Sequence, residues 1–202
     1  MRTAILASGR GSNLQAIVKE WQNGHLPIDI VAVGSDQPDA LALKYAQKAG
    51  ISVKVFSKAE YSDRASQEEG LLSWFKESKV ELLLLAGYMK VLSENFIDKV
   101  EFPILNIHPS LLPAFSGLHA QRQALEYGVK FSGCTVHYVD KGLDSGPIIL
   151  QEAVQVLADD TEATLAERIL EVEHQLYPRA VKLVAGDKLE RKGRRVLIKA
   201  GG

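Results

Sequence analysis

The sequence lacks the features of a secreted, nucleic-acid-binding or membrane protein. It has a single cysteine, Cys134, which cannot form an internal disulfide, and a lone thiol is typical of a reducing compartment. It also lacks an excess of one charge, because 24 Lys and Arg residues are balanced by 25 Asp and Glu residues, for a net charge of −1. That balance indicates no nucleic-acid or membrane partner. We therefore expect a cytoplasmic protein.

Long hydrophobic runs are also lacking. The longest strongly apolar stretch, residues 82–86, is far shorter than the roughly 20 residues that cross a membrane. The apolar stretch at residues 3–8 is too short for the core of a signal peptide. What is present is a globular composition, with 46% hydrophobic and 24% charged residues over a length of 202. This composition predicts one ordinary domain.

Short apolar runs alternate with amphipathic stretches through the first half. The runs are continuous, as expected for strands covered on both faces, and lie at 3–7, 30–33, 52–56, 82–86 and 104–107. Helical spacing between them predicts helices at 14–21 and 41–49 and from 62 past 75. This order predicts a Rossmann-like α/β fold with a mainly parallel sheet flanked by helices.

The second half has a different pattern. Residues 134–139 alternate between two faces, and 148–156 are the expected partner strand, which predicts a mixed or antiparallel C-terminal part. Thr164 and Glu167 have the spacing of a capping box, which predicts a long helix from there to about residue 184. Residues 189–198 are predicted to form a solvated hairpin.

A glycine-rich turn, residues 9–13, follows the first predicted strand. Its free N–H groups and the helix dipole favour an anion, and Ser12 or Asn13 can cap the helix. A dinucleotide site would need a third glycine where Leu14 stands, although Asp36 is placed to serve a ribose. A single terminal phosphate fits better, and an ordinary capped turn is the alternative.

Residues 105–113, Leu-Asn-Ile-His-Pro-Ser-Leu-Leu-Pro, suggest a catalytic constellation. Asn106 and His108 are two positions apart, so both side chains project to one face of a strand end. An amide donor beside an imidazole can bind a developing oxyanion and move a proton; a structural pair is the alternative. Asp144, in the glycine-rich loop 140–147, would favour the charged imidazole if it lay nearby, which spacing alone cannot show.

Together these segments closely resemble the phosphoribosylglycinamide formyltransferase family, folate-dependent enzymes of purine synthesis. The matching segments span about residues 1–180 and lie at 8–16, 86–89, 105–113, 117–120, 135–139 and 142–148. The resemblance implies transfer of the formyl group of 10-formyltetrahydrofolate, as cosubstrate, to the amine of glycinamide ribonucleotide in IMP biosynthesis. The amine would attack directly. No metal is expected, because the histidines lack ligand spacing.

The resemblance also implies residue roles. Asn106 and His108 would polarise the formyl oxygen, and Asp144 would keep His108 protonated and help to move protons from the amine. The ribonucleotide would be bound by Gly11, Ser12, Asn13 and Glu173. Folate would be bound by Arg64, Met89, Val91, Leu92, Asn106, Asp140, Gly142 and Asp144.

One formyltransferase domain would then cover residues 1–202. Its phosphate- or nucleotide-binding half would be 1–100, and its catalytic and folate-binding half, with the C-terminal hairpin, 101–202. The expected partners are the two small-molecule substrates, and the protein would be a monomer or homodimer.

Two other functions stay open at this point. A formyltetrahydrofolate hydrolase would use water in place of the amine, although hydrolase relatives usually carry a further N-terminal regulatory domain. A non-catalytic nucleotide-binding protein would use the same first half. It would give no reason for Asn106, His108 and Asp144 to occur in one chain.

Overall fold

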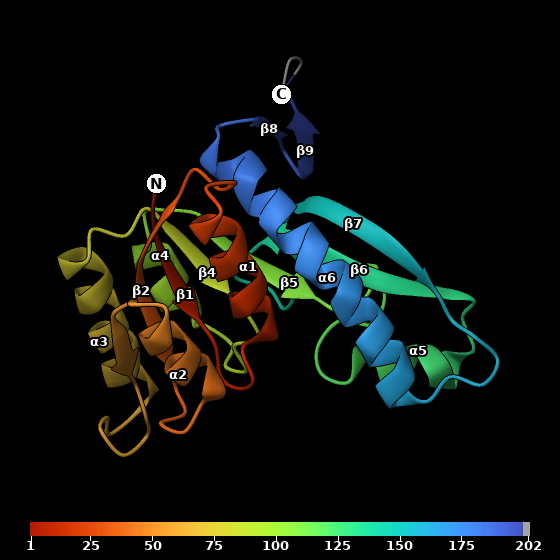
Figure 1. The fold of residues 1–202 in the computed structure, drawn as a ribbon, viewed down its shortest axis with the longest axis horizontal. Helices are drawn as coiled ribbons and strands as arrows, with labels where there is room; N and C mark the ends of the chain where they lie inside the picture. Colours follow the sequence, from red (N-terminus) through yellow and green to blue (C-terminus); the bar gives the residue numbers. More distant parts are fainter. Residues whose placement is uncertain (200–202) are drawn as a thin grey trace. The chain divides into compact units, whose positions relative to one another are not determined.

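A computed structural model of the protein describes residues 1–199 (Figure 1). The chain forms two compact units, the first from Met1 to Leu105 and the second beginning at Asn106. No helix within residues 1–199 is long and apolar enough to cross a membrane. The prediction of one domain over 1–202 stays a prediction, and its last three residues lie outside the described part of the chain.

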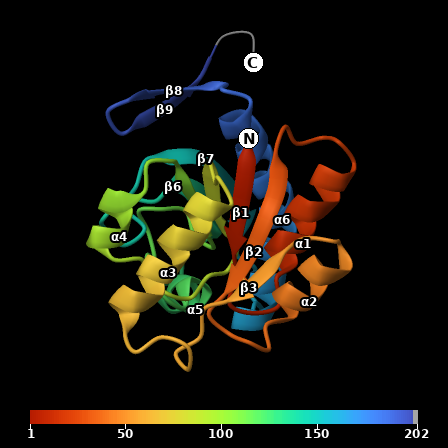
Figure 2. The ribbon, with the colours of Figure 1, turned by 90° about the vertical axis from the view of Figure 1, so that its left-hand side faces the viewer.

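The first unit alternates strands and helices, as predicted. Its elements are β1 (Arg2–Leu6), α1 (Ser12–Gln22), β2 (Asp29–Ser35), α2 (Leu41–Lys48), β3 (Val53–Val55), α3 (Arg64–Glu77), β4 (Leu82–Leu85) and α4 (Glu94–Lys99). Strand β1 pairs in parallel with β2 and β4, and β2 pairs in parallel with β3. Helices α1 and α2 cover one face of these strands, and α3 and α4 cover the other (Figure 2). Both faces are therefore covered, which explains the continuous apolar runs.

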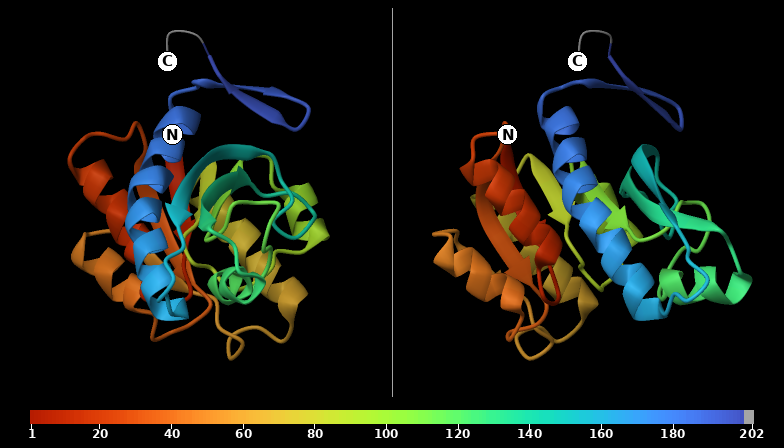
Figure 3. Two further views of the ribbon diagram at one scale, coloured as in Figure 1. Left: turned by 90° about the vertical axis from the view of Figure 1, so that its right-hand side faces the viewer. Right: turned by 45° about the vertical axis from the view of Figure 1, so that its right-hand side comes forward.

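The second unit is built on antiparallel strands. Strand β5 (Ile104–His108) begins in the first unit and ends in the second. It is followed by α5 (Ala120–Tyr127), β6 (Phe131–Tyr138), β7 (Ile148–Gln155), α6 (Glu162–Ala185), β8 (Leu189–Lys192) and β9 (Arg195–Ile198). Strand β6 pairs antiparallel with β7, and β8 with β9. Helix α6 packs along β6 and β7 (Figure 3). The predicted α/β fold with a parallel sheet and an antiparallel C-terminal part is confirmed.

Two helix starts differ from the sequence prediction. The long helix begins one turn earlier than expected, because Thr161 is its N-cap and forms the capping box with Thr164; Glu167 takes no part in the box. Helix α3 begins at Arg64 and is capped by Asp63, whose side chain accepts from the N–H of Ser66 at 2.8 Å. Helices α4 and α5 were not predicted at all. The predicted C-terminal hairpin is present.

The core of the first unit is an aromatic and aliphatic layer beneath α3. Every residue of β4 is buried, and the rings of Phe56, Trp74 and Phe75 contact one another in series at tilted angles, with centroids 5.2 and 5.6 Å apart. Burying side chains of this size supplies most of the stabilisation of such a unit. The carboxyl ends of its parallel strands are consequently rigid supports for the loops that follow them.

Candidate active site

The turn between β1 and α1 presents backbone N–H groups at the start of a helix. Gly11 is the N-cap with φ +74°, and a Cβ there would lie 2.7 Å from the Cβ of Ala42, so only glycine fits. Ser12 and Asn13 are the first helical residues. Among the described residues no side chain caps the helix, which corrects the expectation that Ser12 or Asn13 does so. Backbone N–H groups at the start of a helix favour an anion.

Ser8 connects this turn to two neighbouring loops of the first unit through hydrogen bonds. Its Oγ donates to Oδ1 of Asp36 at 2.5 Å and accepts from the N–H of Met89 at 2.9 Å. The other oxygen of Asp36 accepts from the side chain of Gln37 at 2.8 Å. Both carboxylate oxygens of Asp36 are thus engaged, and a ribose would have to compete for them. This arrangement disfavours a dinucleotide site that uses Asp36.

Asp144 and His108 are in contact in the second unit. Oδ2 of Asp144 lies 3.3 Å from Nδ1 of His108, and the two side chains are 12% and 6% exposed. The same oxygen accepts from the N–H of Gly117 at 2.8 Å. Nε2 of His108 lies 2.8 Å from the carbonyl oxygen of Phe115. Both ring nitrogens therefore face oxygen acceptors, an arrangement that suits a doubly protonated imidazole able to act as a proton donor.

His137 is a further member of this cluster that was not predicted. Its Nδ1 lies 2.9 Å from the carbonyl oxygen of Tyr138 and must carry the proton there, so Nε2 accepts from Nδ2 of Asn106 at 3.2 Å. Burial lowers the pKa of His137, against smaller opposing effects of Tyr138 and Asp144, and favours this neutral form. The bond fixes the amide of Asn106 and leaves its second N–H available. The alternation of β6, which places Thr135 and His137 on one face, was the available signal.

The segment after β5 is anchored to β6. Oγ1 of Thr135 donates to the carbonyl of Ser110 at 2.6 Å and accepts from the N–H of Leu112 at 3.0 Å. Thr135 is completely buried, so these bonds are shielded from water. They hold the chain that carries the Phe115 carbonyl to His108.

Asp140 and Gly142 shape the loop that carries Asp144. Oδ1 of Asp140 accepts from Oγ of Ser145 at 2.6 Å and from the N–H of Gly142 at 3.1 Å. A Cβ on Gly142 would lie 2.1 Å from Oγ of Ser145, so a larger residue would open the loop. Both residues are therefore placed to support Asp144 as well as to meet a ligand.

Glu173 lies on the buried face of α6 and is 6% exposed. Burial, with smaller contributions from Glu173 and Glu152, raises the pKa of Cys134 to about 12. The thiol on β6 consequently stays protonated and is not a nucleophile. Glu173 is the predicted ribose ligand, and a carboxylate is a suitable acceptor for a sugar hydroxyl.

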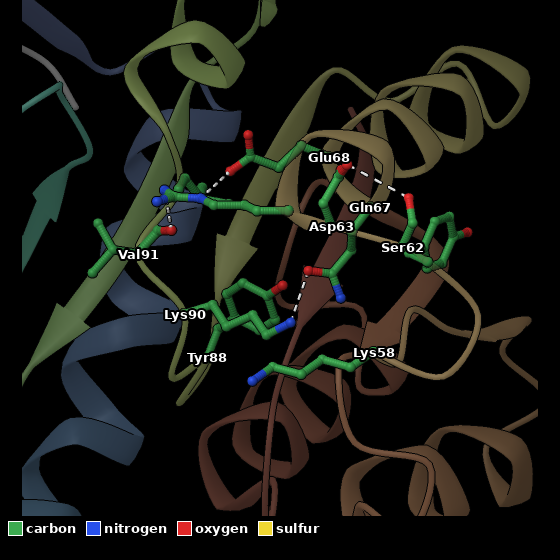
Figure 4. A pocket seen from close by; sticks show the side chains of 11 residues that line it. Lys58, Ser62, Asp63, Gln67, Glu68, Tyr88, Lys90 and Val91 are labelled. Carbon is green, nitrogen blue, oxygen red and sulfur yellow. Dashed lines mark hydrogen bonds and ion pairs between the residues drawn. The ribbon is translucent and has the colours of Figure 1, made fainter.

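A cavity of about 580 Å³ lies in the first unit, between the start of α3 and the segment after β4 (Figure 4). Its lining is Lys58, Tyr61, Ser62, Asp63, Arg64, Gln67, Glu68, Tyr88, Lys90, Val91 and Leu92. Three of the predicted folate residues, Arg64, Val91 and Leu92, therefore lie together. Met89 is not among the lining residues, and its side chain is 67% exposed.

Arg64 is held across the cavity. Its Nε donates to Oε1 of Glu68 at 3.0 Å and its Nη2 to the carbonyl of Val91 at 2.6 Å. Lys90 donates to Oε1 of Gln67 at 2.7 Å. Burial, with the charges of nearby carboxylates, raises the pKa of Tyr88. The cavity thus combines an apolar end at Val91 with fixed cations, a combination suited to an elongated ligand that ends in a carboxylate.

The chemistry available in the second unit is that of acyl transfer. Asn106 offers an amide N–H, His108 an imidazole and Asp144 a carboxylate, the set needed to stabilise an oxyanion and to move a proton. Within residues 1–199, no group of three His, Cys, Asp or Glu side chains is arranged to hold a metal ion.

Comparison with known proteins assigns the chain to a family. Residues 1–181 match the formyl transferase family. The chain belongs to that family. The resemblance stated from the sequence, and the class of formyl-transferring enzyme that it implied, are thereby confirmed. The β8–β9 hairpin lies beyond the matched residues.

Two curated relatives of this formyl transferase differ greatly in length. Phosphoribosylglycinamide formyltransferase of Bacillus subtilis is 39% identical over 183 residues, which cover 91% of this chain and 94% of that protein. The trifunctional purine biosynthetic protein adenosine-3 of Drosophila melanogaster is 45% identical over 185 residues, or 91% of this chain. The chain spans only 14% of the length of that relative.

Solved structures of family members superimpose closely on the chain. Glycinamide ribonucleotide transformylase 1 of Symbiobacterium toebii has a TM-score of 0.95 and 47% identity, covering 98% of this chain and 94% of that one. Phosphoribosylglycinamide formyltransferase of Anaplasma phagocytophilum has a TM-score of 0.92 and 42% identity, covering 100% of this chain and 96% of that one.

Proposed function

We propose that the protein transfers the formyl group of 10-formyltetrahydrofolate to the amine of glycinamide ribonucleotide, a step of purine biosynthesis. The observation that carries this proposal is the buried contact between His108 and Asp144, 3.3 Å apart, beside an Asn106 amide fixed by His137. Support also comes from family members that are named for this activity.

Asn106 and His108 act on the formyl oxygen. Attack of the amine on the formyl carbon forms a C–N bond and places negative charge on that oxygen. The free N–H of Asn106 and a proton of His108 stabilise the charge, and loss of one such donor typically costs ~10²–10³ in rate. In the structure Nε2 of His108 faces the Phe115 carbonyl, so when substrate binds this N–H donates to the formyl oxygen in place of, or together with, that carbonyl.

Asp144 assists the proton transfers of the reaction. Its negative charge, 3.3 Å from Nδ1, stabilises positive charge on the imidazole of His108 and orients the ring for proton transfer. The attacking amine loses one proton, and N10 of the folate gains one as the old C–N bond breaks. Asp144 assists this transfer from one nitrogen to the other, and no covalent enzyme intermediate is needed.

Each predicted ligand-binding residue is assigned a role. The N–H groups of Gly11, Ser12 and Asn13 bind the phosphate of the ribonucleotide, and Glu173 binds its ribose. Val91 and Leu92 contact the pterin, with Met89 beside them. Arg64 binds a carboxylate of the folate tail in competition with Glu68, and Asp140 and Gly142 hold the loop against the pterin.

One incubation separates this function from its alternatives. The purified protein is mixed with 10-formyltetrahydrofolate, and folate absorbance is followed with and without glycinamide ribonucleotide. Turnover that depends on the ribonucleotide is expected. Equal turnover without the ribonucleotide would identify a hydrolase, and binding of both ligands without turnover would identify a non-catalytic binding protein. His108→Ala is the control that should bind the ribonucleotide and not turn over.

A further inference from the structure

The loop between β6 and β7 determines where the carboxylate of Asp144 lies. Asp144 has φ +48°, a left-handed conformation that costs a residue other than glycine about 1 kcal/mol. Such a conformation persists only where the surroundings hold it. The side chain then reaches His108 and accepts from the N–H of Gly117. Contacts that hold the neighbouring backbone therefore control the distance between Asp144 and His108.

Inside the loop, one set of bonds closes its base and its tip. The N–H of Tyr138 donates to the carbonyl of Pro147 at 3.0 Å, which closes the base. A Cβ on Gly146 would lie 1.7 Å from the carbonyl oxygen of Tyr138, so only glycine permits this approach. Asp140 accepts from Ser145 and closes the tip. None of these bonds contacts the backbone of Asp144 or the carbonyl that follows it.

A contact from outside the loop acts at that position. Nη2 of Arg194 donates to the carbonyl oxygen of Ser145, the residue after Asp144, at 2.7 Å. Arg194 lies in the turn between β8 and β9, where Gly193 has φ +62° and its carbonyl accepts from Nε of Arg191 at 3.1 Å. Strand β9 packs against β7, which starts just after the loop (Figure 1). The hairpin thus contacts both strand β7 and the loop that precedes it.

We propose that Arg194 is a positioning residue for the formyl transfer reaction, which holds the Asp144 loop through the carbonyl of Ser145 so that the carboxylate faces His108. The expected effect on kcat rests on the proposed function, whereas the position of the Asp144 carboxylate does not. It gives a role to the C-terminal hairpin, which lies beyond residues 1–181 matched by the family. A guanidinium suits this task because its donors are fixed in a plane and its charge strengthens the bond.

Kinetics of two variants and a matched control test the inference. Arg194→Ala should lower kcat about tenfold, less than the ~10²-fold that a 1 Å misplacement can cost. Its KM for the ribonucleotide should not change, because phosphate binding is assigned to another part of the chain. Arg194→Lys retains one donor and should recover part of kcat. Arg195→Ala removes the adjacent arginine, for which residues 1–199 show no side-chain bond to the loop, and should match wild type.

A double-mutant cycle shows whether Arg194 acts through Asp144. Asp144→Asn removes the charge whose position Arg194 is proposed to control. In that background, Arg194→Ala should lower kcat much less than it does in the wild type, because residues that act as one unit are not additive. Fully additive losses would mean that Arg194 supports the fold in general, and would overturn the inference.

Hydrogen exchange of the Gly117 amide tests the geometry without any substrate. This N–H donates to Asp144, so its protection reports whether the carboxylate is in place. Exchange should be faster in Arg194→Ala and unchanged in Arg195→Ala; unchanged exchange in both would refute the positioning role. If wild type shows no formyl transfer, the proposed function fails, and this measurement still decides the inference about Arg194. Circular dichroism confirms that each variant is folded.

Discussion

Asp144→Asn is the substitution with the most decisive expected outcome. It keeps the size of the side chain and removes its charge, 3.3 Å from the imidazole of His108. At that distance the attraction between unit charges is about 5 kcal/mol for an effective dielectric constant of about 20. Solvent does little to screen it, because both side chains are nearly buried. Part of the attraction is offset by the cost of removing the charges from water.

The rate should therefore fall strongly. A loss of about 10²-fold in kcat corresponds to roughly 2.7 kcal/mol, about half of the gross attraction. We expect at least this loss, within the ~10²–10⁴ range typical of general acid–base catalysis.

The assay is kcat and kcat/KM as a function of pH, with ribonucleotide affinity measured separately by calorimetry. Affinity should be unchanged, since the substitution leaves the Gly11–Asn13 turn intact. Asp159→Asn, an exposed aspartate of the same unit, controls for the loss of one negative charge. A kcat within about threefold of wild type in Asp144→Asn would refute the acid–base role.

Three further outcomes follow from the structure. Gly11→Ala should destabilise the protein by about 1–3 kcal/mol in thermal unfolding, whereas Gly9→Ala, with open space around its Cβ position, should change little; equal effects would contradict the strain argument. His137 has a lowered pKa, so the unfolded state binds more protons and the free energy of unfolding should fall as pH drops below about 6.5. In urea titrations His137→Gln should reduce this pH dependence of the unfolding free energy, although the half-buried His174, whose pKa is also lowered by burial, retains part of it. Thr161→Ala should cost about 1 kcal/mol by removing the cap of α6, and an unchanged urea midpoint would argue against the observed capping box.

The sheet was predictable because its signal is local. A strand buried on both faces must be apolar throughout, and the run at 82–86 corresponds to β4, Leu82–Leu85, whose residues are all buried. The short helices α4 and α5, with six and eight residues, were missed because they are too short to show a period. Helix α5 also begins after His119, whose left-handed φ of +59° has no sequence signature.

The start of α6 shows how a correct motif gives a wrong boundary. Thr164 and Glu167 have the spacing of a capping box, but so do Thr161 and Thr164 once a threonine hydroxyl replaces the acid. The helix begins at the earlier position because a neighbouring ion pair stabilises the extra turn. Asp160, just before the cap, binds Arg168 through two nitrogens at 2.7 and 2.8 Å. Arg168 lies two turns along the helix, too far for a local motif to include it.

Sequence spacing predicts some of the contacts in the site, and the others depend on the fold. Asn106 and His108 share a face because they are two apart on β5, which is a local rule. That Asp144 reaches His108 depends on β6 and β7 as a pair, and that Arg194 reaches Ser145 depends on a hairpin packed against β7. Backbone carbonyls accept two of the decisive bonds, one from His108 and one from Arg194. Since every residue has a carbonyl, such acceptors leave no trace in the sequence, and mutating the donor is the only way to test them by substitution.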